Sequence, residues 1–338
     1  MTIHRVAAVQ AEPVWLEVEA STEKTIALIE QAAAGGAELV AFPETWIPGY
    51  PVFLWSYPVH EQFPFIARYR ANSPTADGAH LSRIRDAAAR NDITVVVGFS
   101  EKSGGSLYMA QQIIGPDGEV IQHRRKLKPT HAERTLFGES DGSGLKVVDS
   151  TVGRLGALNC FEHLQPLSKF VYYSQNEQVH VAGWPCIGIQ GDAPMLGAEA
   201  LIAISKTYAL EGSTFVLMAS QIMSDEGAMQ FPTKDGQPTQ IYTGGGGIAR
   251  IIGPDSSDWA TPLDPTEEGL IFADIDLAAI ELAKAFVDPA GHYARPDVTR
   301  LLVDHSPRNA VASMRAEPEQ HRHAQGDATH DAPADVEE

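Results

Sequence analysis

The segment Gly156-Ala157-Leu158-Asn159-Cys160-Phe161-Glu162-His163 joins an apolar strand to a cysteine. Residues 154–159 have the composition of a β-strand, and an apolar, helix-like run follows Cys160. The thiol is therefore expected at the carboxyl end of a strand, where nucleophiles are often presented. On local sequence alone, however, a single cysteine is more often a buried structural thiol. Its role depends on the residues that accompany it.

Working outward from this segment, short β-rich runs alternate with helical patterns. Strands are predicted at residues 6–9, 39–42, 94–99 and 154–159. One helix is predicted to begin at Ser21 as its N-cap and to end at Gly35-Gly36, and another covers about residues 197–210. This alternation predicts an α/β fold.

The sequence Ile-Ile-Gly-Pro-Asp occurs twice, at residues 113–117 and 251–255. Each copy runs from an apolar strand into a turn signal, and both are interpreted as hairpin turns. Because hairpins pair antiparallel strands, they favour mixed sheets over a purely parallel one.

Charge and composition exclude several classes of protein. The 338 residues contain 25 Lys and Arg against 44 Asp and Glu, which gives a net charge of -19 and disfavours partners such as nucleic acid or an anionic membrane. No apolar run reaches transmembrane length. With only two cysteines, a reducing, cytoplasmic location is expected. Residues 1–304 are predicted to form the folded unit, and residues 305–338, rich in Pro, His and acid, a disordered tail.

Two charged residues also follow apolar strands. Glu44, in Ala41-Phe42-Pro43-Glu44-Thr45-Trp46, could be desolvated and so become a better base, although a turn carboxylate is the plainer interpretation. Lys126 lies in the basic run 123–130, which by itself is typical of a solvated surface. A thiol that acts near neutral pH needs such a base or such a cation.

Taken together, these segments resemble the nitrilase superfamily over most of the chain. The resemblance implies a four-layer α-β-β-α sandwich with mixed sheets and a Glu-Lys-Cys triad. Glu44, Lys126 and Cys160 fall on the motifs of that triad, and Glu133, in the segment 129–134, matches a second glutamate that positions substrate and lysine. It also implies a homo-oligomer that is based on dimers and can extend into spirals.

Within the superfamily, three stretches are similar to the nitrilase branch: residues 160–163, 176–185 and 288–297. The branch more often has Trp after the cysteine, whereas this chain has Phe161. The implied activity is hydrolysis of organic nitriles to carboxylic acid and ammonia through covalent attachment to the thiol, which needs no metal or organic cofactor. An amidase or a cyanide-hydrolysing enzyme would keep the same triad, and an inactive assembly protein is a further alternative.

The predicted substrate pocket draws on aromatic residues near the triad. Proposed substrate-binding residues are Tyr50, Trp55, Phe161, His163 and Trp184. The histidines lack the spacing of a metal site, so none is predicted. Gly244-Gly245-Gly246-Gly247 lacks the Lys-Ser or Lys-Thr of a phosphate loop and is interpreted as a flexible loop. Cys186 has no basic neighbour and is interpreted as structural.

Overall fold

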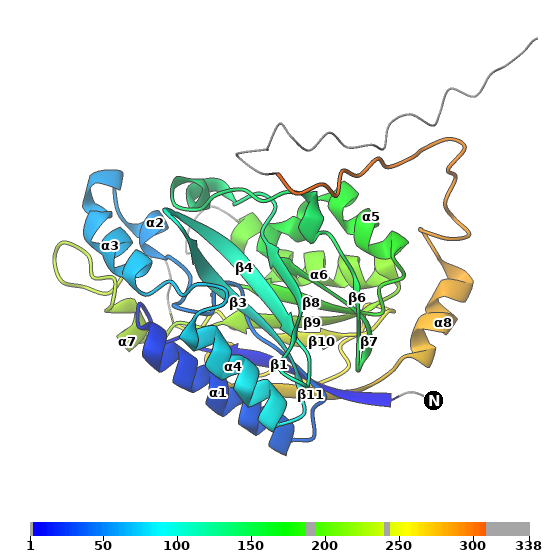
Figure 1. Ribbon diagram of the computed structural model, residues 1–338, viewed down its shortest axis with the longest axis horizontal. Coiled ribbons are helices and arrows are strands. Elements are labelled where there is room, and N and C mark those ends of the chain that lie inside the picture. The colour runs from blue at the N-terminus through cyan, green and yellow to red at the C-terminus, as the bar shows by residue number, and fades with distance from the viewer. Residues whose placement is uncertain (1–2, 187–193, 240–243, 309–338) are drawn as a thin grey trace, which may run out of the picture. The chain divides into compact units, whose positions relative to one another are not determined.

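Strands and helices alternate along residues 3–186, 194–239 and 244–308, the part of the chain that the computed structural model describes (Figure 1). The described residues up to Ser306 belong to one compact unit. Most of the predicted disordered tail, residues 309–338, lies outside the described ranges. Residues 240–243, just before the glycine run that begins at Gly244, also lie outside them. The boundary at residue 304 therefore stays a prediction.

The strands are β1 (Ile3–Ala11), β2 (Leu39–Ala41), β3 (Thr94–Ser103), β4 (Ser106–Ile114), β5 (Val120–Arg125), β6 (Val148–Ser150), β7 (Gly153–Asn159), β8 (Val179–Trp184), β9 (Phe215–Gln221), β10 (Arg250–Ile252) and β11 (Gly269–Asp276). The α-helices are α1 (Val18–Ala34), α2 (Phe53–Ser56), α3 (Phe63–Ala71), α4 (Ala79–Arg90), α5 (Pro166–Ser174), α6 (Ala198–Gly212), α7 (Asp225–Ala228) and α8 (Ala278–Phe286). Short 3-10 helices are η1 (Val59–Glu61), η2 (His131–Thr135), η3 (Gly142–Gly144), η4 (Cys160–Leu164) and η5 (Pro194–Leu196).

These strands form a mixed sheet in the order β5-β4-β3-β2-β1-β9-β8-β7-β6. β11 pairs antiparallel with β1, and β10 pairs antiparallel with β9. The two strands at the centre of this order, β1 and β9, pair over a short length, through only Gln10↔Ser220 and Ala11↔Gln221. The sheet is therefore two halves that share one narrow seam, as the predicted pair of mixed sheets requires.

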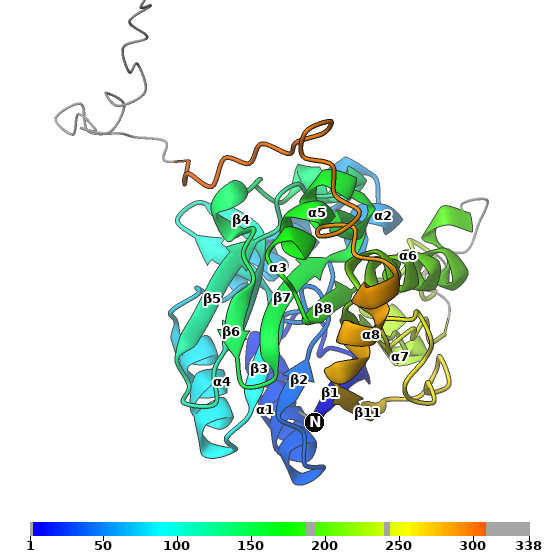
Figure 2. The same cartoon turned by 90° about the vertical axis from the view of Figure 1, so that its right-hand side faces the viewer.

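Apolar residues fill three layers around these two halves. α1 and α4 pack on the outer face of the β1–β3 half through residues such as Ile29 and Ile84. A second cluster lies between the halves, where Val6 and Val96 share a core with Val181 and Leu217. α5 and α6 cover the outer face of the β7–β9 half, as Figures 1 and 2 show. This is the predicted α-β-β-α sandwich.

The start of α1 differs from the sequence prediction. α1 begins at Val18 after Glu17, so Ser21 is a buried residue within the helix and not its N-cap. Its hydroxyl donates to the Val14 carbonyl instead (2.9 Å). Both repeated segments form hairpin turns as predicted. The first joins β4 to β5, and in the second, after β10, the Gly253 N–H donates to the Ser257 carbonyl (2.9 Å) and Ile252 pairs antiparallel with Asp258.

The fold brings three strand ends together at one edge. Glu44 follows β2, Lys126 directly follows β5, and Cys160 directly follows β7. Parallel strands present their carboxyl ends on the same side of a sheet. No helix within residues 3–186, 194–239 and 244–308 combines the length and the apolar character needed to cross a bilayer.

Candidate active site

Lys126 lies at the centre of a buried group of charges. Its Nζ donates to Oε1 of Glu44 (2.8 Å) and to Oε2 of Glu133 (2.8 Å), and the three side chains are at most 1 % exposed. We call Glu44, Lys126 and Glu133 the lysine cluster. The two buried carboxyl groups share one ammonium, and this ammonium can offset buried negative charge only while the lysine is protonated. The cluster therefore provides a fixed cation with an acidic group on each side.

The backbone around Glu44 is held from two sides. Its carbonyl accepts a hydrogen bond from the Gln221 side chain (2.6 Å), and the loop passes so close to β3 that a Cβ on Gly98 would lie 2.2 Å from the Pro43 oxygen. Glycine at position 98 is thus required for this approach. Among the described residues, nothing donates a hydrogen bond to Oε2 of Glu44. One carboxylate oxygen is left as an acceptor in the site.

Glu133 is positioned by a capping box at the start of η2. Its Oε2 accepts from the Thr130 backbone N–H (2.6 Å), and its Oε1 accepts from the Tyr50 hydroxyl (2.8 Å). Trp55 in turn donates to the Tyr50 oxygen (3.1 Å). These contacts connect the lysine cluster to the aromatic segment that follows Glu44.

Cys160 stands at a sharp turn between β7 and η4. Its φ of +48° lies in the left-handed region, which is uncommon for a residue with a side chain and typical of functional turns. Its sulfur and carboxylate oxygens of Glu44 and Glu133 all lie within 4.8 Å of one another. A metal ion could use three such ligands, but the ammonium of Lys126 already binds both carboxylates. The thiol thus faces the lysine cluster directly.

Burial determines the acid–base properties of this group. It raises the pKa of Glu44 to about 8, a rise that Lys126 opposes and Glu133 reinforces. It also raises the pKa of the Cys160 thiol well above its usual value, and the Glu44 carboxylate adds to this effect. Burial alone would lower the pKa of Lys126, but Glu133 and Glu44 hold it above its usual value. The lysine therefore stays charged at neutral pH while Glu44 can gain or lose a proton.

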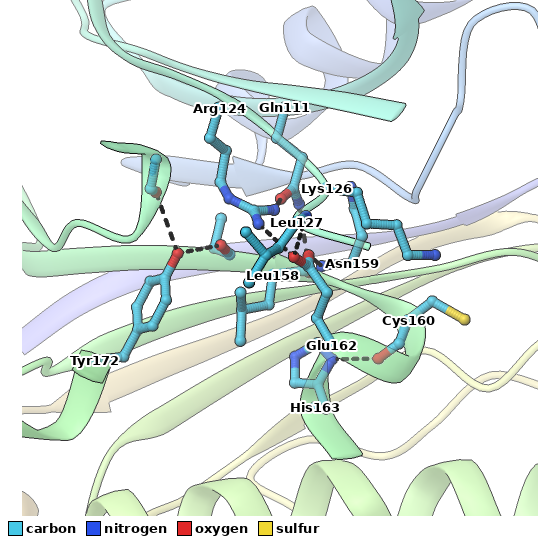
Figure 3. Close-up of polar contacts among 12 residues, drawn as sticks. Gln111, Arg124, Lys126, Leu127, Leu158, Asn159, Cys160, Glu162, His163 and Tyr172 are labelled. Carbon is cyan, nitrogen blue, oxygen red and sulfur yellow. Dashed lines mark hydrogen bonds and ion pairs between the residues drawn. The ribbon is translucent and has the colours of Figure 1, made fainter. Parts of the chain in front are cut away.

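A second buried ion pair joins the strand end of Lys126 to that of Cys160 (Figure 3). Arg124 donates to Oε1 of Glu162 (2.7 Å) and to Gln111 (2.7 Å). Glu162 also accepts from the backbone N–H groups of Leu127 (2.9 Å) and Asn159 (2.9 Å). Burial would raise the pKa of Glu162, but Arg124 holds it below its usual value. By itself the basic run is typical of a solvated surface. The alternation of strand β5 and its continuation instead turns Arg124 and Lys126 inward.

A cavity opens beside the thiol. Ten residues line it, namely Tyr50, Trp55, Thr130, Glu133, Cys160, Phe161, Pro185, Cys186, Leu196 and Leu201. Three of the five predicted substrate-binding residues are among them. Cys186, which was interpreted as structural, also lines the cavity and is 2 % exposed. Sequence reasoning missed Thr130, Pro185, Leu196 and Leu201, because their apolar or neutral side chains carry no chemical signal.

His163 and Trp184 are not among the lining residues. His163 Nδ1 contacts the backbone carbonyl of Cys160 (2.6 Å), so its ring turns back into the protein. Trp184 is fully buried and stacks on the His163 ring at a centroid distance of 5.4 Å. Both residues therefore support the nucleophile's segment from behind, away from the cavity that substrate would enter.

Comparisons with known proteins agree with this geometry. The family model described as carbon-nitrogen hydrolase matches residues 5–285. An aliphatic nitrilase of Rhodococcus rhodochrous is 50% identical over 299 residues, which is 88% of this chain and 81% of that protein. A nitrilase of Pseudomonas syringae is 50% identical over 92% of each chain. An arylacetonitrilase of Aspergillus kawachii is 46% identical over 94% of this chain and 98% of its own.

Solved structures share the fold at low sequence identity. The NitFhit protein of C. elegans superposes with a TM-score of 0.67 at 17% identity, covering 91% of this chain and 69% of its own. An amidase from Nesterenkonia sp. AN1, solved with acrylamide added at its active site cysteine, has a TM-score of 0.59 at 17% identity and covers 84% of this chain and 100% of its own.

Proposed function

This chain belongs to the nitrilase branch of the carbon-nitrogen hydrolase family, and we propose that it hydrolyses organic nitriles to carboxylic acids and ammonia. The observation that carries the proposal is the lysine cluster packed against the Cys160 thiol. A nitrile carbon is a weak electrophile, so its hydration needs an activated nucleophile and a positive group near the nitrogen. The site holds both within one cavity.

In the proposed first step, Oε2 of Glu44 takes the thiol proton. The sulfur of Cys160 attacks the nitrile carbon, a carbon–sulfur bond forms, and one π bond of the nitrile becomes a lone pair on nitrogen. Lys126 stabilises the negative charge that develops there, and the proton returns from Glu44 to the nitrogen. The product is a neutral thioimidate attached to Cys160.

In the second stage, water replaces nitrogen on the same carbon. Glu44 removes a proton from the water as it adds, and Glu133 keeps Lys126 and the substrate in position. The tetrahedral intermediate expels ammonia to leave a thioester, and a second water hydrolyses this to the acid and the free thiol. If the tetrahedral intermediate expels the thiol instead, an amide is released.

The runner-up function is an amidase, because amide hydrolysis uses the same triad and passes through the same thioester. The relatives reported above favour nitriles over amides as substrates. They are an aliphatic nitrilase, a nitrilase and an arylacetonitrilase. They do not distinguish among nitriles for this chain. An inactive assembly protein is disfavoured, since all expected members of the triad are present and lie close together.

We also propose that the protein works as a homo-oligomer in the cytoplasm. The resemblance to the superfamily supports self-association, and two unpaired thiols suit a reducing compartment. Size-exclusion chromatography with light scattering tests the first part, and a purely monomeric protein at working concentration would contradict it.

The decisive experiment is a screen for ammonia release. Phenylacetonitrile, mandelonitrile, benzonitrile, an aliphatic nitrile and cyanide are tested beside the matching amides, with Cys160→Ala as the control. We expect turnover of organic nitriles by the parent and none by folded Cys160→Ala. Rates confined to amides would establish the amidase function, and parent-level turnover by Cys160→Ala would refute the mechanism.

A further inference from the structure

Behind the nucleophile, four fully buried polar side chains form a continuous chain of hydrogen bonds. His163 Nδ1 contacts the Cys160 carbonyl oxygen (2.6 Å), and His163 Nε2 contacts Nε2 of His180 (2.9 Å). His180 Nδ1 contacts Glu177 Oε1 (2.7 Å), and the Tyr208 hydroxyl donates to Glu177 Oε2 (2.7 Å). We call His163, His180, Glu177 and Tyr208 the histidine chain. None of the four is used in the proposed mechanism.

These contacts determine how many protons the chain holds. A carbonyl oxygen only accepts, so Nδ1 of His163 must carry a proton. The contact between the two rings needs one proton, and the contact between His180 and Glu177 needs another. These three contacts need three protons, whichever atoms hold them. A carboxylate and two neutral imidazoles carry only two, so the chain contains one proton more. Its net charge is therefore zero.

Burial decides where that proton resides. It raises the pKa of Glu177 well above its usual value and lowers that of His180 well below its own. It also lowers the pKa of His163 to about 3, with a further contribution from His180. Glu177 is therefore the protonated acid, and both rings are neutral. The charged groups that act on the rings are Arg124, Glu162 and Lys169.

The end of the chain fixes one peptide plane. In a trans peptide the C=O and N–H point in opposite directions. Because His163 holds the carbonyl of the Cys160–Phe161 peptide from behind, the Phe161 N–H points the other way, toward the thiol. This N–H lowers the pKa of the thiol, against the larger effect of burial. Cys160, the residue that precedes this peptide N–H, has a positive φ.

We propose that the histidine chain is a positioning array that locks the Cys160–Phe161 peptide, so that the Phe161 N–H faces the sulfur and stabilises the thiolate. The array rests on the proposed role of Cys160 as the nucleophile, which it deepens. His163 and its partners touch neither substrate nor the reacting atoms. Their effect reaches the reaction through the orientation of one backbone amide.

The test compares two substitutions at one position. His163→Phe keeps the ring and removes the donor to the Cys160 carbonyl, whereas His163→Asn retains an N–H near the position of Nδ1. The readouts are kcat and KM on a nitrile and the pH dependence of Cys160 alkylation by iodoacetamide, with the modified residue identified by mass spectrometry. For His163→Phe we expect the alkylation profile to move to higher pH, with about a tenfold fall in thiolate-dependent rate at neutral pH and in kcat. KM should change less than about twofold.

His163→Asn should recover most of the parent profile, which a general packing defect would not predict. Equal profiles for the parent and His163→Phe would overturn the array. If His163→Phe does not fold, Tyr208→Phe is used instead, because it removes the hydrogen bond at the far end of the chain. A smaller shift of the alkylation profile to higher pH would then support the array. An alkylation profile equal to that of the parent would refute it. Alkylation needs no nitrile turnover, so a protein that follows these predictions without hydrolysing nitriles would refute the proposed function alone.

Discussion

Two buried polar groups flank Cys160, and each contains a glutamate with a different set of partners. The lysine cluster holds Glu44 against an ammonium, whereas the histidine chain holds Glu177 against an imidazole and a phenol. Burial raises both carboxyl pKa values, but only Glu44 has a cation to oppose the rise, to about 8, so it exchanges its proton near neutral pH. Burial alone thus makes a carboxyl group neutral and structural. A buried cation beside it makes a usable base.

The strongest test of this contrast is Glu44→Gln. The amide cannot take the thiol proton, so kcat/KM on a nitrile should fall at least ~100-fold, the usual effect of removing a positioned acid–base group. Lys126 keeps Glu133 as its partner, and the fold should survive. Circular dichroism and thermal unfolding provide the control. A folded variant with activity within about threefold of the parent would show that Glu44 is not the base.

The sequence predicted the lysine cluster better than the histidine chain, for a physical reason. Glu44, Lys126 and Cys160 each follow a strand, so the rule that strand ends meet at one edge brings them together. The nitrilase nature of the family and the layered fold followed from the same motifs and are confirmed. The roles of the individual residues stay predictions.

The histidine chain could not be predicted because its contacts depend on register and helix packing. His180 lies opposite Gly156 in the β7–β8 pairing, and Tyr208 reaches Glu177 from α6. The residue types suggested hydrogen-bonding or packing roles for His163 and His180 and a pocket contact for His163, but did not connect them to Glu177 or Tyr208. The same limit applies to the Arg124–Glu162 ion pair, whose partners are 38 residues apart.

A pH profile sharpens the contrast without any substitution. Glu44 must be deprotonated to act as a base, and its raised pKa keeps it protonated in more acidic solution. We therefore expect kcat/KM on a neutral nitrile to rise with pH and to level off above about 8, roughly tenfold per unit on the acidic limb. The midpoint belongs to the coupled group of Glu44, Lys126 and Cys160. Since the pKa of His163 is about 3, this ring should add no second transition between pH 6 and 9. A flat or falling profile over that range would contradict the assignment.

Gly156→Ala should perturb the histidine chain while leaving the lysine cluster intact. A Cβ at this position would lie 1.9 Å from Oε1 of Glu177 and 2.8 Å from the Tyr172 ring. Such overpacking should lower the free energy of unfolding by about 1–3 kcal/mol, measured by denaturant titration. Gly105→Ala is the matched control, since a Cβ there meets nothing within 4 Å. Equal stability of the two variants would show that Glu177 has room to move.

The smallest effect is expected for Glu177→Gln, the same chemical change that should inactivate the enzyme at Glu44. A protonated Glu177 donates to His180 and accepts from Tyr208, and a glutamine amide can do both in nearly the same shape. The free energy of unfolding should therefore change by less than about 1 kcal/mol, whereas Glu177→Leu, which leaves two buried groups without a partner, should cost about 1–3 kcal/mol for each. Denaturant titration of the two variants makes the comparison. If Gln proves as costly as Leu, Glu177 is ionised and His180 is a cation, because only then would an amide fail to replace the acid.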